Sequence, residues 1–423
     1  MLLFAEGFDD FSTNADLLMT SSADPTATTV TGRTGAGRAA QITGTGGYIN
    51  FSFPARAVII AGFAFKGSST LGLSSTEWLR IQFQAGGVTL FSIVQRSAAG
   101  LDFFDATANS IDFTTGWLGS ASFSNFSSYI EVKLTPGYAG QVVVRIDGAT
   151  VLNTGGNFSV PLSTTMLEGG GHALPYLYTG DTSLVVVSDA GMPSPPYVFH
   201  PGSLTSGTPL VCTSKSGTTW NFTPVIASGE AWGAGQIITT YAASASCDSI
   251  GFSALGSGYA VGAIDDLYVI DTTGAQNNTF LGDVRITSLA PTGDGADSGW
   301  TPNAGSTHYT QVDESPLDYD TSYVNATAAH QSDTYTFPAV PSINGTIAAV
   351  QIRDYAKSDS GGTDKLQCIA RVAGTDYLAP AGDQFIHAVY TGLDSIFELN
   401  PATGLAWALA DVNGAQFGQK RTV

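Results

Sequence analysis

The chain has 423 residues, 50 of them glycine, and a formal net charge of −19 at pH 7. Its 16 Lys and Arg residues are scattered singly, whereas a surface that binds nucleic-acid phosphates or anionic lipid needs clustered basic residues. No apolar run approaches the roughly 20 residues of a membrane span. We therefore predict no nucleic-acid partner and no membrane insertion.

The acidic residues indicate the fold class. Of the 35 acidic residues only seven are Glu, and Lys is also rare. Asp favours turns because its short side chain binds nearby backbone N–H groups, whereas Glu and Lys are good helix formers. This composition predicts an all-β protein, and at this length two or three domains are expected.

The first part of the chain predicts a series of short strands separated by Gly or Ser. Residues 128–134 alternate apolar and charged, as a half-buried strand does. Asp147 and Gly148 form the strongest short hairpin signal. Strands at this spacing indicate a sandwich or jelly roll. The predicted strands are 48–53, 57–66, 78–84, 88–95, 101–105, 128–134, 141–146 and 149–152.

The sandwich pattern stops near residue 157 and resumes near Cys247, leading into a buried strand at 263–271. The intervening stretch is rich in proline and aromatic residues, with strands expected at 184–188 and 236–241. Loops at the ends of a sandwich tolerate insertions, so we predict an inserted β lobe. The expected domains are a discontinuous jelly roll (1–159 plus 247–279), the lobe (160–246) and a second β-sandwich (280–423).

The C-terminal part predicts a second series of strands. Residues 272–279 form a polar turn, residues 280–283 open a strand, and 291–297 is a loop rich in Gly and Asp. Asp313, Asp318 and Asp320 are expected in a solvated turn. One short helix is expected at 405–415. The further predicted strands are 334–337, 346–353, 366–372, 385–390 and 396–399.

Several segments resemble one group of proteins. Residues 6–11 with 32–37, then 129–133 with 143–148, and then 264–269 resemble the concanavalin A-like (laminin-G-type) jelly rolls of virion structural proteins of tailed bacteriophages. Residues 280–285, 300–302, 312–314 and 400–418 resemble the second domain of those proteins. The likeness covers nearly the whole chain except the insertion. These segments are structural and carry over no catalytic residues.

The resemblance implies a non-enzymatic virion component, first of all a tail-fibre or appendage protein with an adhesion or docking role. Capsid decoration, as cement or head fibre, is the alternative placement. The implied partners are other tail or capsid proteins, further copies of the chain and a host-surface glycan. Residues 1–5 are too short for a signal peptide. We therefore expect assembly in the host cytoplasm and residence in the virion.

No catalytic motif occurs in the sequence. The chain contains no G-x-S-x-G elbow, no phosphate-binding loop, no H-E-x-x-H pair and no Glu-x-Asp-x-Glu cluster of the kind found in glycosidases of this fold. We predict no enzymatic activity. A carboxylate pair assembled from distant Asp residues remains open, so a glycosidase or polysaccharide depolymerase is the alternative from another functional class.

Four aromatic residues of the insertion, Tyr176, Tyr197, Trp220 and Trp232, are candidates for contact with a carbohydrate or a partner protein. The competing interpretation is that such side chains build the core of a small domain. We favour the core interpretation for the insertion as a whole, and name these four first if a receptor-binding surface exists.

Asp265, Asp266 and Asn277 are the candidate metal ligands, with Asn278 as a substitute for Asn277, because Ca²⁺ prefers such hard oxygen ligands. Adjacent residues of a strand point to opposite faces, so both carboxylates are not expected in one site. We favour the interpretation that one Asp caps a loop and the other is solvated. No cofactor is predicted, with Ca²⁺ left open.

The three cysteines, Cys212, Cys247 and Cys368, are widely spaced. A disulfide framework would show a denser, even set. We predict three free, mostly buried thiols, and leave open a pairing of Cys212 with Cys247.

Overall fold

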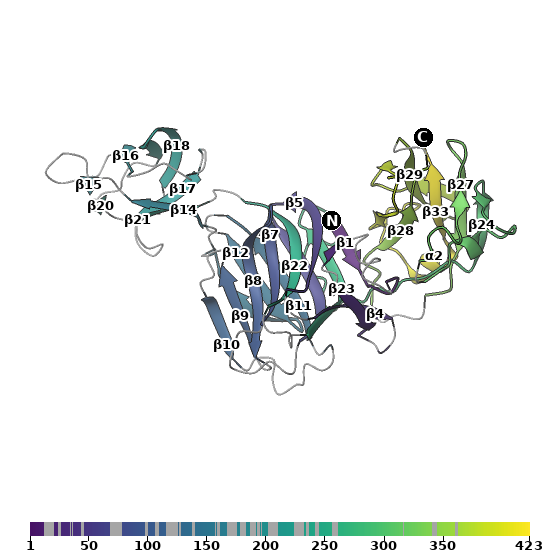
Figure 1. Cartoon of the computed structure of the whole chain (residues 1–423), viewed down its shortest axis with the longest axis horizontal. Helices are drawn as coiled ribbons and strands as arrows, with labels where there is room; N and C mark the ends of the chain where they lie inside the picture. The colour runs from purple at the N-terminus through teal and green to yellow at the C-terminus, as the bar shows by residue number, and fades with distance from the viewer. Residues whose placement is uncertain are drawn as a thin grey trace.

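The computed structural model describes residues 1–11, 21–23, 27–33, 35, 37–43, 46–67, 78–97, 100–105, 110–115, 126, 128–137, 140–156, 158, 161–166, 176–177, 183–186, 192, 195, 197–201, 210–223, 232–233, 237–241, 245–255, 261–315, 317–340, 345–359 and 363–423. Within these residues the protein is all-β, and the strand pairs are antiparallel. Figure 1 shows three groups of strands along the long axis of the molecule.

The central group is a sandwich of two sheets. The first, here called the β23 sheet, has eight strands, with β1 (Leu2–Glu6) paired to β23 outside the main order. Its main order is β13 (Ala149–Asn153), β12 (Gln141–Ile146), β11 (Ser128–Thr135), β6 (Ile59–Lys66), β23 (Val261–Asp271), β4 (Arg38–Thr43) and β3 (Thr28–Thr31).

The second sheet of this sandwich, here called the β22 sheet, has seven strands. Both sheets pair strands from the start of the chain with one strand that follows the insertion, β22 or β23. The order of the β22 sheet is β10 (Ser110–Thr115), β9 (Gly100–Asp105), β8 (Val88–Ser97), β7 (Trp78–Ala85), β22 (Cys247–Leu255), β5 (Tyr48–Arg56) and β2 (Ser22–Ala23).

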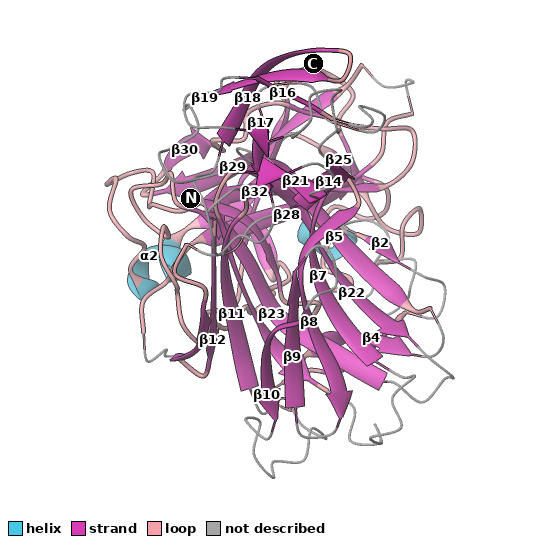
Figure 2. Cartoon of the chain, turned by 90° about the vertical axis from the view of Figure 1, so that its left-hand side faces the viewer, coloured by secondary structure: helices cyan, strands magenta, loops and turns pink. Residues whose placement is uncertain are grey.

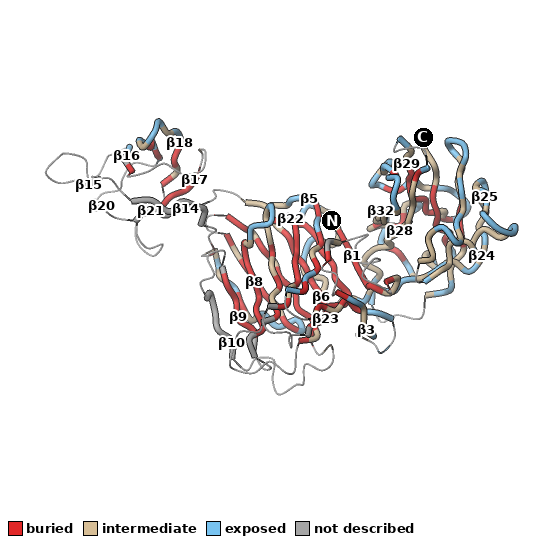
Figure 3. Tube along the Cα trace, viewed as in Figure 1, coloured by how far each residue is buried: buried red, intermediate tan, exposed pale blue. Residues whose placement is uncertain are grey.

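The core of the sandwich lies between these two sheets, as the buried strands in Figure 3 show. Alternation along the strands supplies it: in β12 every second residue is buried. Phe252 of the β22 sheet packs edge-to-face against Phe63 of the β23 sheet, with ring centroids 5.2 Å apart. The β12–β13 hairpin turns at Asp147 and Gly148 with φ of 49° and 80°, so the predicted turn is confirmed.

The insertion forms a separate small group of strands in Figure 1; in Figure 2, turned by 90°, this group faces the viewer and overlaps the strands behind it. Its core consists of aromatic and aliphatic side chains around Trp220. A further short pair joins β15 (Tyr176–Leu177) to β20 (Trp232–Gly233). The main sheet has the order β14 (Pro161–Met166), β21 (Ile237–Tyr241), β17 (Tyr197–Pro201), β18 (Leu210–Ser216), β19 (Thr219–Thr223) and β16 (Ser183–Val185).

The C-terminal sandwich packs a six-stranded sheet against the ladder of β28 (Val350–Ala356) and β32 (Thr391–Phe397). A short pair joins β25 (Thr301–Pro302) to β26 (Val324–Asn325). The six-stranded sheet has the order β24 (Gly293–Ser298), β27 (Ser332–Thr336), β33 (Gln416–Arg421), β29 (Lys365–Val372) and β30 (Thr375–Leu378), with β31 (Gln384–Phe385) also paired to β29.

Helical structure in the described residues is confined to short segments, a 3₁₀ turn η1 (Tyr309–Gln311) and the helix α2 (Leu409–Gly414). The helix predicted at 405–415 is therefore present but shorter, because Leu405 pairs with Asn400 in a β-bridge. In the described part of the chain, no helix is long and apolar enough to cross a membrane.

Two strand predictions in the C-terminal part were wrong. The strand expected to open at 280–283 is absent, because side chains of the β23 sheet accept hydrogen bonds from this backbone: Gly282 N–H donates to Glu131 and Leu281 N–H to the Tyr268 hydroxyl. The strand expected at 385–390 is reduced to β31.

The loop predicted at 291–297 also differs from the structure, since most of it is β24. Gly295 permits this pairing, because a Cβ there would lie 2.4 Å from the Thr334 hydroxyl of β27. The strand is irregular, with a register shift between Asp294 and Ser298.

Candidate functional site

Two of the four aromatic candidates lie in the core of the lobe. Tyr197 is 1% exposed and Trp220 is fully buried, and their rings pack edge-to-face with centroids 5.4 Å apart. Phe199 also packs edge-to-face against Trp220, with ring centroids 5.6 Å apart. The candidate contact role of Tyr197 and Trp220 is therefore corrected, and the core interpretation favoured for the insertion is confirmed at these two residues.

The other two candidates, Tyr176 and Trp232, lie on the β15–β20 pair, where Tyr176 pairs with Gly233 and Leu177 with Trp232. Their side chains lie outside the described residues. Their contact role remains a prediction.

Asp265 and Asp266 lie at a β-bulge in β23, where the register with β6 shifts between Asp265 and Tyr268. Asp266 has a φ of 52°, in the left-handed region that Asp tolerates better than most residues. The Arg33 backbone N–H donates to Asp265 at 2.8 Å, and the Arg33 guanidinium lies 3.4 Å from Asp266. The bulge thus brings both carboxylates to one arginine, contrary to the expectation of opposite faces.

Cations of the chain already hold the Asp266 carboxylate. The Arg285 guanidinium lies 3.6 Å from the Asp266 carboxylate, and the Ile286 N–H donates to Asp266 at 2.8 Å. Burial raises the pKa of Asp265 to about 7 and also raises the pKa of Asp266, against the effect of Arg33. Asp265 accepts the backbone N–H of Arg33 and so caps the turn that follows β3, as expected of one Asp, but the other is not solvated, because Asp266 is only 4% exposed.

Asn277 belongs to a different hydrogen-bond network, beyond the C-terminal end of β23. Its side-chain amide donates to the Ala348 carbonyl at 2.9 Å and to Glu398 at 3.1 Å. Glu398 also accepts the Leu2 N–H at 2.5 Å. The structure therefore does not assemble the candidate calcium ligands, and the described residues contain no cluster of three His, Cys, Asp or Glu side chains able to hold a metal ion.

The outer face of the β23 sheet is sealed by the segment that follows it. Tyr268 donates to Glu131 at 2.5 Å, and Gly282 N–H donates to the same Glu131 oxygen at 2.8 Å. The Arg145 guanidinium stacks over the Phe280 ring at 4.0 Å. This face buries apolar side chains from both modules, namely Leu2, Ile60, Ala64, Tyr129, Tyr268 and Ile270 with Phe280, Leu281, Val284, Ala349 and Ile396.

A buried ion cluster completes the joint between the two sandwiches. Arg353 of β28 donates to Glu6 of β1 at 2.7 Å and binds Asp394 of β32 through two nitrogens, at 2.7 and 3.1 Å. Burial raises the pKa of Glu6 to about 7, while Arg353 acts in the opposite direction. Gln351 adds a hydrogen bond to the Ala5 carbonyl at 3.1 Å. The joint therefore has defined polar geometry as well as an apolar contact.

An aromatic surface cluster lies on the C-terminal sandwich, here called the tyrosine patch and consisting of Tyr319, Tyr323, Tyr390, Lys357 and Asp320. The rings of Tyr319 and Tyr390 pack edge-to-face at 5.4 Å, and the Lys357 ammonium lies 5.1 Å over the Tyr390 ring. Tyr390 donates to Asp320 at 3.0 Å, and Lys357 forms an ion pair with Asp320. Tyr323 is 40% exposed.

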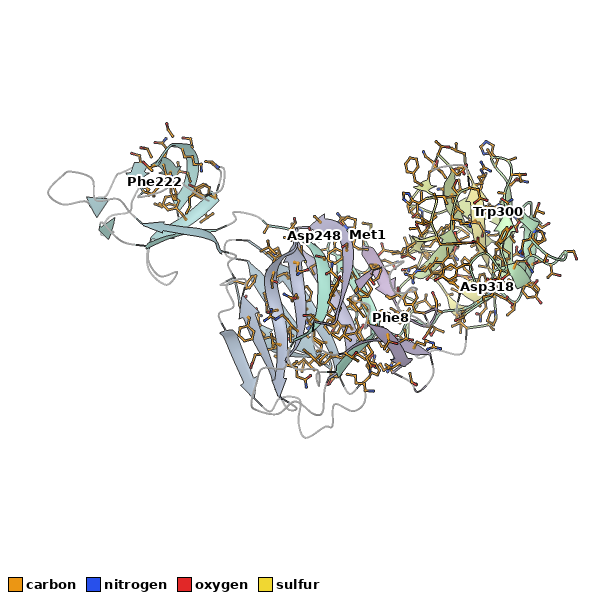
Figure 4. All side chains as sticks on the ribbon, in the orientation of Figure 1. Met1, Phe8, Phe222, Asp248, Trp300 and Asp318 are labelled. Atoms are coloured by element: carbon orange, nitrogen blue, oxygen red, sulfur yellow. The ribbon has the colours of Figure 1, made fainter. Side chains whose placement is uncertain are left out.

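The strand register explains this arrangement. Ala356 at the end of β28 pairs with Thr391 at the start of β32, so the next residues outward, Lys357 and Tyr390, lie side by side. The loop that carries Asp318 and Asp320, here called the acidic loop, meets this end of the ladder where Asp320 contacts Lys357 and Tyr390. Figure 4 labels Asp318, the neighbour of Tyr319 in the sequence, on this module. The pairing of β28 with β32, which are distant in the sequence, therefore determines where the residues of the tyrosine patch meet.

The loop that carries Tyr319 is fixed from within. The Ser322 hydroxyl lies 2.5 Å from Glu314 and 2.8 Å from Asp318. Tyr319 has a φ of 57°, an uncommon conformation for a bulky residue, which surrounding contacts must maintain. The turn expected here is exposed at Asp320, as predicted, and it is also held by hydrogen bonds within the loop.

Hydrogen bonds from Lys357 and Tyr390 lower the pKa of Asp320, and the bond to Asp320 raises the pKa of Lys357. Both groups are therefore ionised at neutral pH. Sequence reasoning missed this cluster, although one signal existed: two of its three tyrosines, Tyr319 and Tyr323, flank an Asp within five residues.

The cysteine prediction is confirmed. Cys212, Cys247 and Cys368 are all free and buried. Cys247 and Cys212 belong to different sheets, and the two do not pair. Cys368 donates its thiol hydrogen to Asp354 at 3.1 Å in the interior of the C-terminal sandwich.

No protein-family model and no curated protein sequence matches this chain. Among solved structures, the receptor-binding domain of botulinum neurotoxin mosaic serotype C/D, with bound tetraethylene glycol and sulfate, aligns at a TM-score of 0.28 and 8% identity, over 95% of this chain and 91% of that one. The binding domain of botulinum neurotoxin DC in complex with rat synaptotagmin II aligns at 0.22 and 8%, over 91% and 90%. A structure described as HCR/D-Sa-GBL1/C aligns at 0.23 and 10%, over 80% and 64%. Scores of this size lend this chain neither a family nor a function.

Proposed function

We propose that this chain is a non-enzymatic structural component of a tailed-phage virion, a tail-fibre or appendage protein with an adhesion or docking role. The joint between the two sandwiches carries the proposal. Here Arg353 links Glu6 to Asp394 in a buried cluster, and residues 280–286 seal the outer face of the β23 sheet. Ionic and apolar contacts of this kind fix how one module is presented on the other.

The acidic groups of the jelly roll support a structural role. Glu131 is 2% exposed beneath the backbone of Gly282, and Asp266 is held by Arg33 and Arg285. A glycosidase needs two carboxylates that reach opposite sides of a glycosidic bond in an open site. In this chain these carboxylates hold elements of the protein together.

An adhesion role is supported by the tyrosine patch, which is exposed on the C-terminal sandwich. The tyrosine patch combines half-exposed aromatic rings with a fixed ion pair, and aromatic side chains are enriched where proteins bind partners. The joint between the two sandwiches does not cover the patch, since the Tyr323 ring is still 40% exposed. Resemblance of several sequence segments to phage virion proteins supports the virion placement.

Immunogold labelling tests the placement. Antibodies against the purified chain should decorate the tails of particles from the phage that encodes it, and a particle without the chain should adsorb more slowly. Labelling confined to the capsid would favour the decoration role instead. Unlabelled particles would contradict the virion proposal, and clearing of a host polysaccharide lawn by purified chain would contradict the non-enzymatic one.

A further inference from the structure

The surface of the C-terminal sandwich offers one site whose chemistry points to a ligand class. The tyrosine patch has three aromatic rings, a carboxylate and an ammonium group drawn from three separate segments of the chain. Asp320 has a side chain that is 67% exposed and Lys357 one that is 28% exposed, so both remain accessible although they are paired. Groups so placed are fixed before any ligand arrives, which reduces the entropy cost of binding.

We propose that the tyrosine patch binds neutral glycans, one or two pyranose rings at a time. A pyranose has an apolar C–H face that gains by burial against an aromatic ring, and a rim of hydroxyls that donate and accept hydrogen bonds. The rings of Tyr323 and Tyr390 supply the apolar surface. Asp320 supplies acceptors and Lys357 donors for neighbouring hydroxyls.

Charge distinguishes neutral from anionic ligands. Lys357 is the cation of the patch, whereas Asp318, Asp320 and Asp359 all lie close enough to affect the titration of Tyr390 or Lys357. The local balance is negative, as is the net charge of −19 for the whole chain. Sulfated, sialylated or phosphorylated ligands are therefore disfavoured.

The size of the patch distinguishes a glycan from a protein partner. A stable protein interface buries about 800 Å² on each side around an apolar centre. Here the aromatic surface consists of a few half-buried rings around an exposed ion pair, with Tyr323 40% exposed. That geometry matches a small polar ligand with apolar faces.

The test is binding of the purified full chain to an array that carries neutral, sialylated and sulfated glycans. Wild-type chain should bind neutral glycans above the anionic ones. Tyr323→Ala removes an exposed ring and Asp320→Asn removes the fixed charge, and each should weaken binding by about tenfold. Tyr48→Ala is the matched control, because Tyr48 is 43% exposed on β5 of the jelly roll, and it should bind like the wild type.

Preferential binding to anionic glycans, or no binding to any glycan on the array, would overturn the inference. So would equal binding by wild type, Tyr323→Ala and Asp320→Asn. The inference rests on the adhesion role proposed above, and the two fail separately. Particles labelled at the tail, whose chain shows no glycan binding, would retain the virion role and remove this one. Glycan binding by a chain absent from particles would do the reverse.

Discussion

Arg353 of the C-terminal sandwich donates a 2.7 Å hydrogen bond to Glu6, in the first strand of the central sandwich, 347 residues earlier. Both side chains are nearly excluded from solvent, at 8% and 2% exposure. Burial alone would lower the pKa of Arg353, but the carboxylates of Glu6 and Asp394 raise it well above its usual value. The pair therefore helps to fix the relative position of two modules that also share an apolar contact at the outer face of the β23 sheet.

Arg353→Met should destabilise the protein by about 3–5 kcal/mol at pH 8, because it leaves a buried carboxylate without its cation. Guanidinium denaturation gives the free energy of unfolding. Glu6→Gln combined with Arg353→Met should recover part of the loss, since the Glu6 carboxylate is then gone and only the less buried Asp394 lacks its cation. A loss in the double variant equal to the sum of the losses in Glu6→Gln and Arg353→Met would show that the two residues are not coupled.

Millimolar Ca²⁺ should leave the melting temperature unchanged relative to EDTA, because Arg33 and Arg285 already neutralise Asp266. Differential scanning fluorimetry measures this directly. A rise in melting temperature with Ca²⁺ that disappears in Asp266→Asn would restore the calcium interpretation of this bulge.

Stability should fall as pH rises through the range in which Asp354 ionises. Burial raises the pKa of Asp354 from 3.8 to about 7, so the folded protein binds this proton more tightly than the unfolded chain does. The stabilising contribution is complete below pH 3.8 and is lost as pH rises towards 7.

Asp354→Asn should therefore flatten the decline of melting temperature between about pH 5 and about pH 8. The slope should be reduced rather than abolished, because burial also raises the pKa of Glu6 and Asp265 to about 7. Asp320→Asn is the surface control and should leave the slope unchanged. A slope in Asp354→Asn identical to that of the wild type would contradict this assignment.

The three thiols should resist Ellman's reagent in the native protein and all react after denaturation. Burial raises the pKa of Cys247 to about 12, so almost no thiolate exists at neutral pH. Recovery of one thiol instead of three, without reductant, would indicate a disulfide that the structure does not contain.

Trp220→Ala should destabilise the lobe by about 3–5 kcal/mol, because it opens a cavity between Tyr197 and Phe199. Calorimetry should show an earlier transition for the lobe alone, since its core is separate from the other two. Trp220→Phe, which keeps an aromatic ring, should cost less. Normal stability with lost host adsorption would return Trp220 to the list of contact residues.

Much of the strand pattern could be predicted from the sequence, because it depends on the local alternation of apolar and polar residues and on the conformational preferences of turn residues. The positive φ values at Asp147 and Gly148 need nothing beyond those two residues and the strand twist. The burial of the cysteines likewise follows from their apolar character, and their free state follows from their odd number and wide spacing. These properties belong to short segments.

The surroundings of Asp266, the lobe core and the tyrosine patch could not be predicted, because each depends on contacts between residues that are distant in the sequence. No residue near Asp266 in the sequence predicts the bulge that turns its side chain towards Arg33. The packing of Trp220 against Tyr197 likewise joins residues that are distant in the sequence. Tyr390 donates a hydrogen bond to Asp320, 70 residues earlier, because the last residue pair of the β28–β32 ladder lies beside the acidic loop.

The sequence by itself thus determined an all-β chain with its strands and hairpins, because side-chain periodicity and turn preferences act over a few residues. Only the tertiary structure decided which aromatic rings lie in a core and which face solvent. It also decided which carboxylates are bound by arginines. Burial and charge pairing depend on which strands become neighbours, and that information is spread over the whole chain.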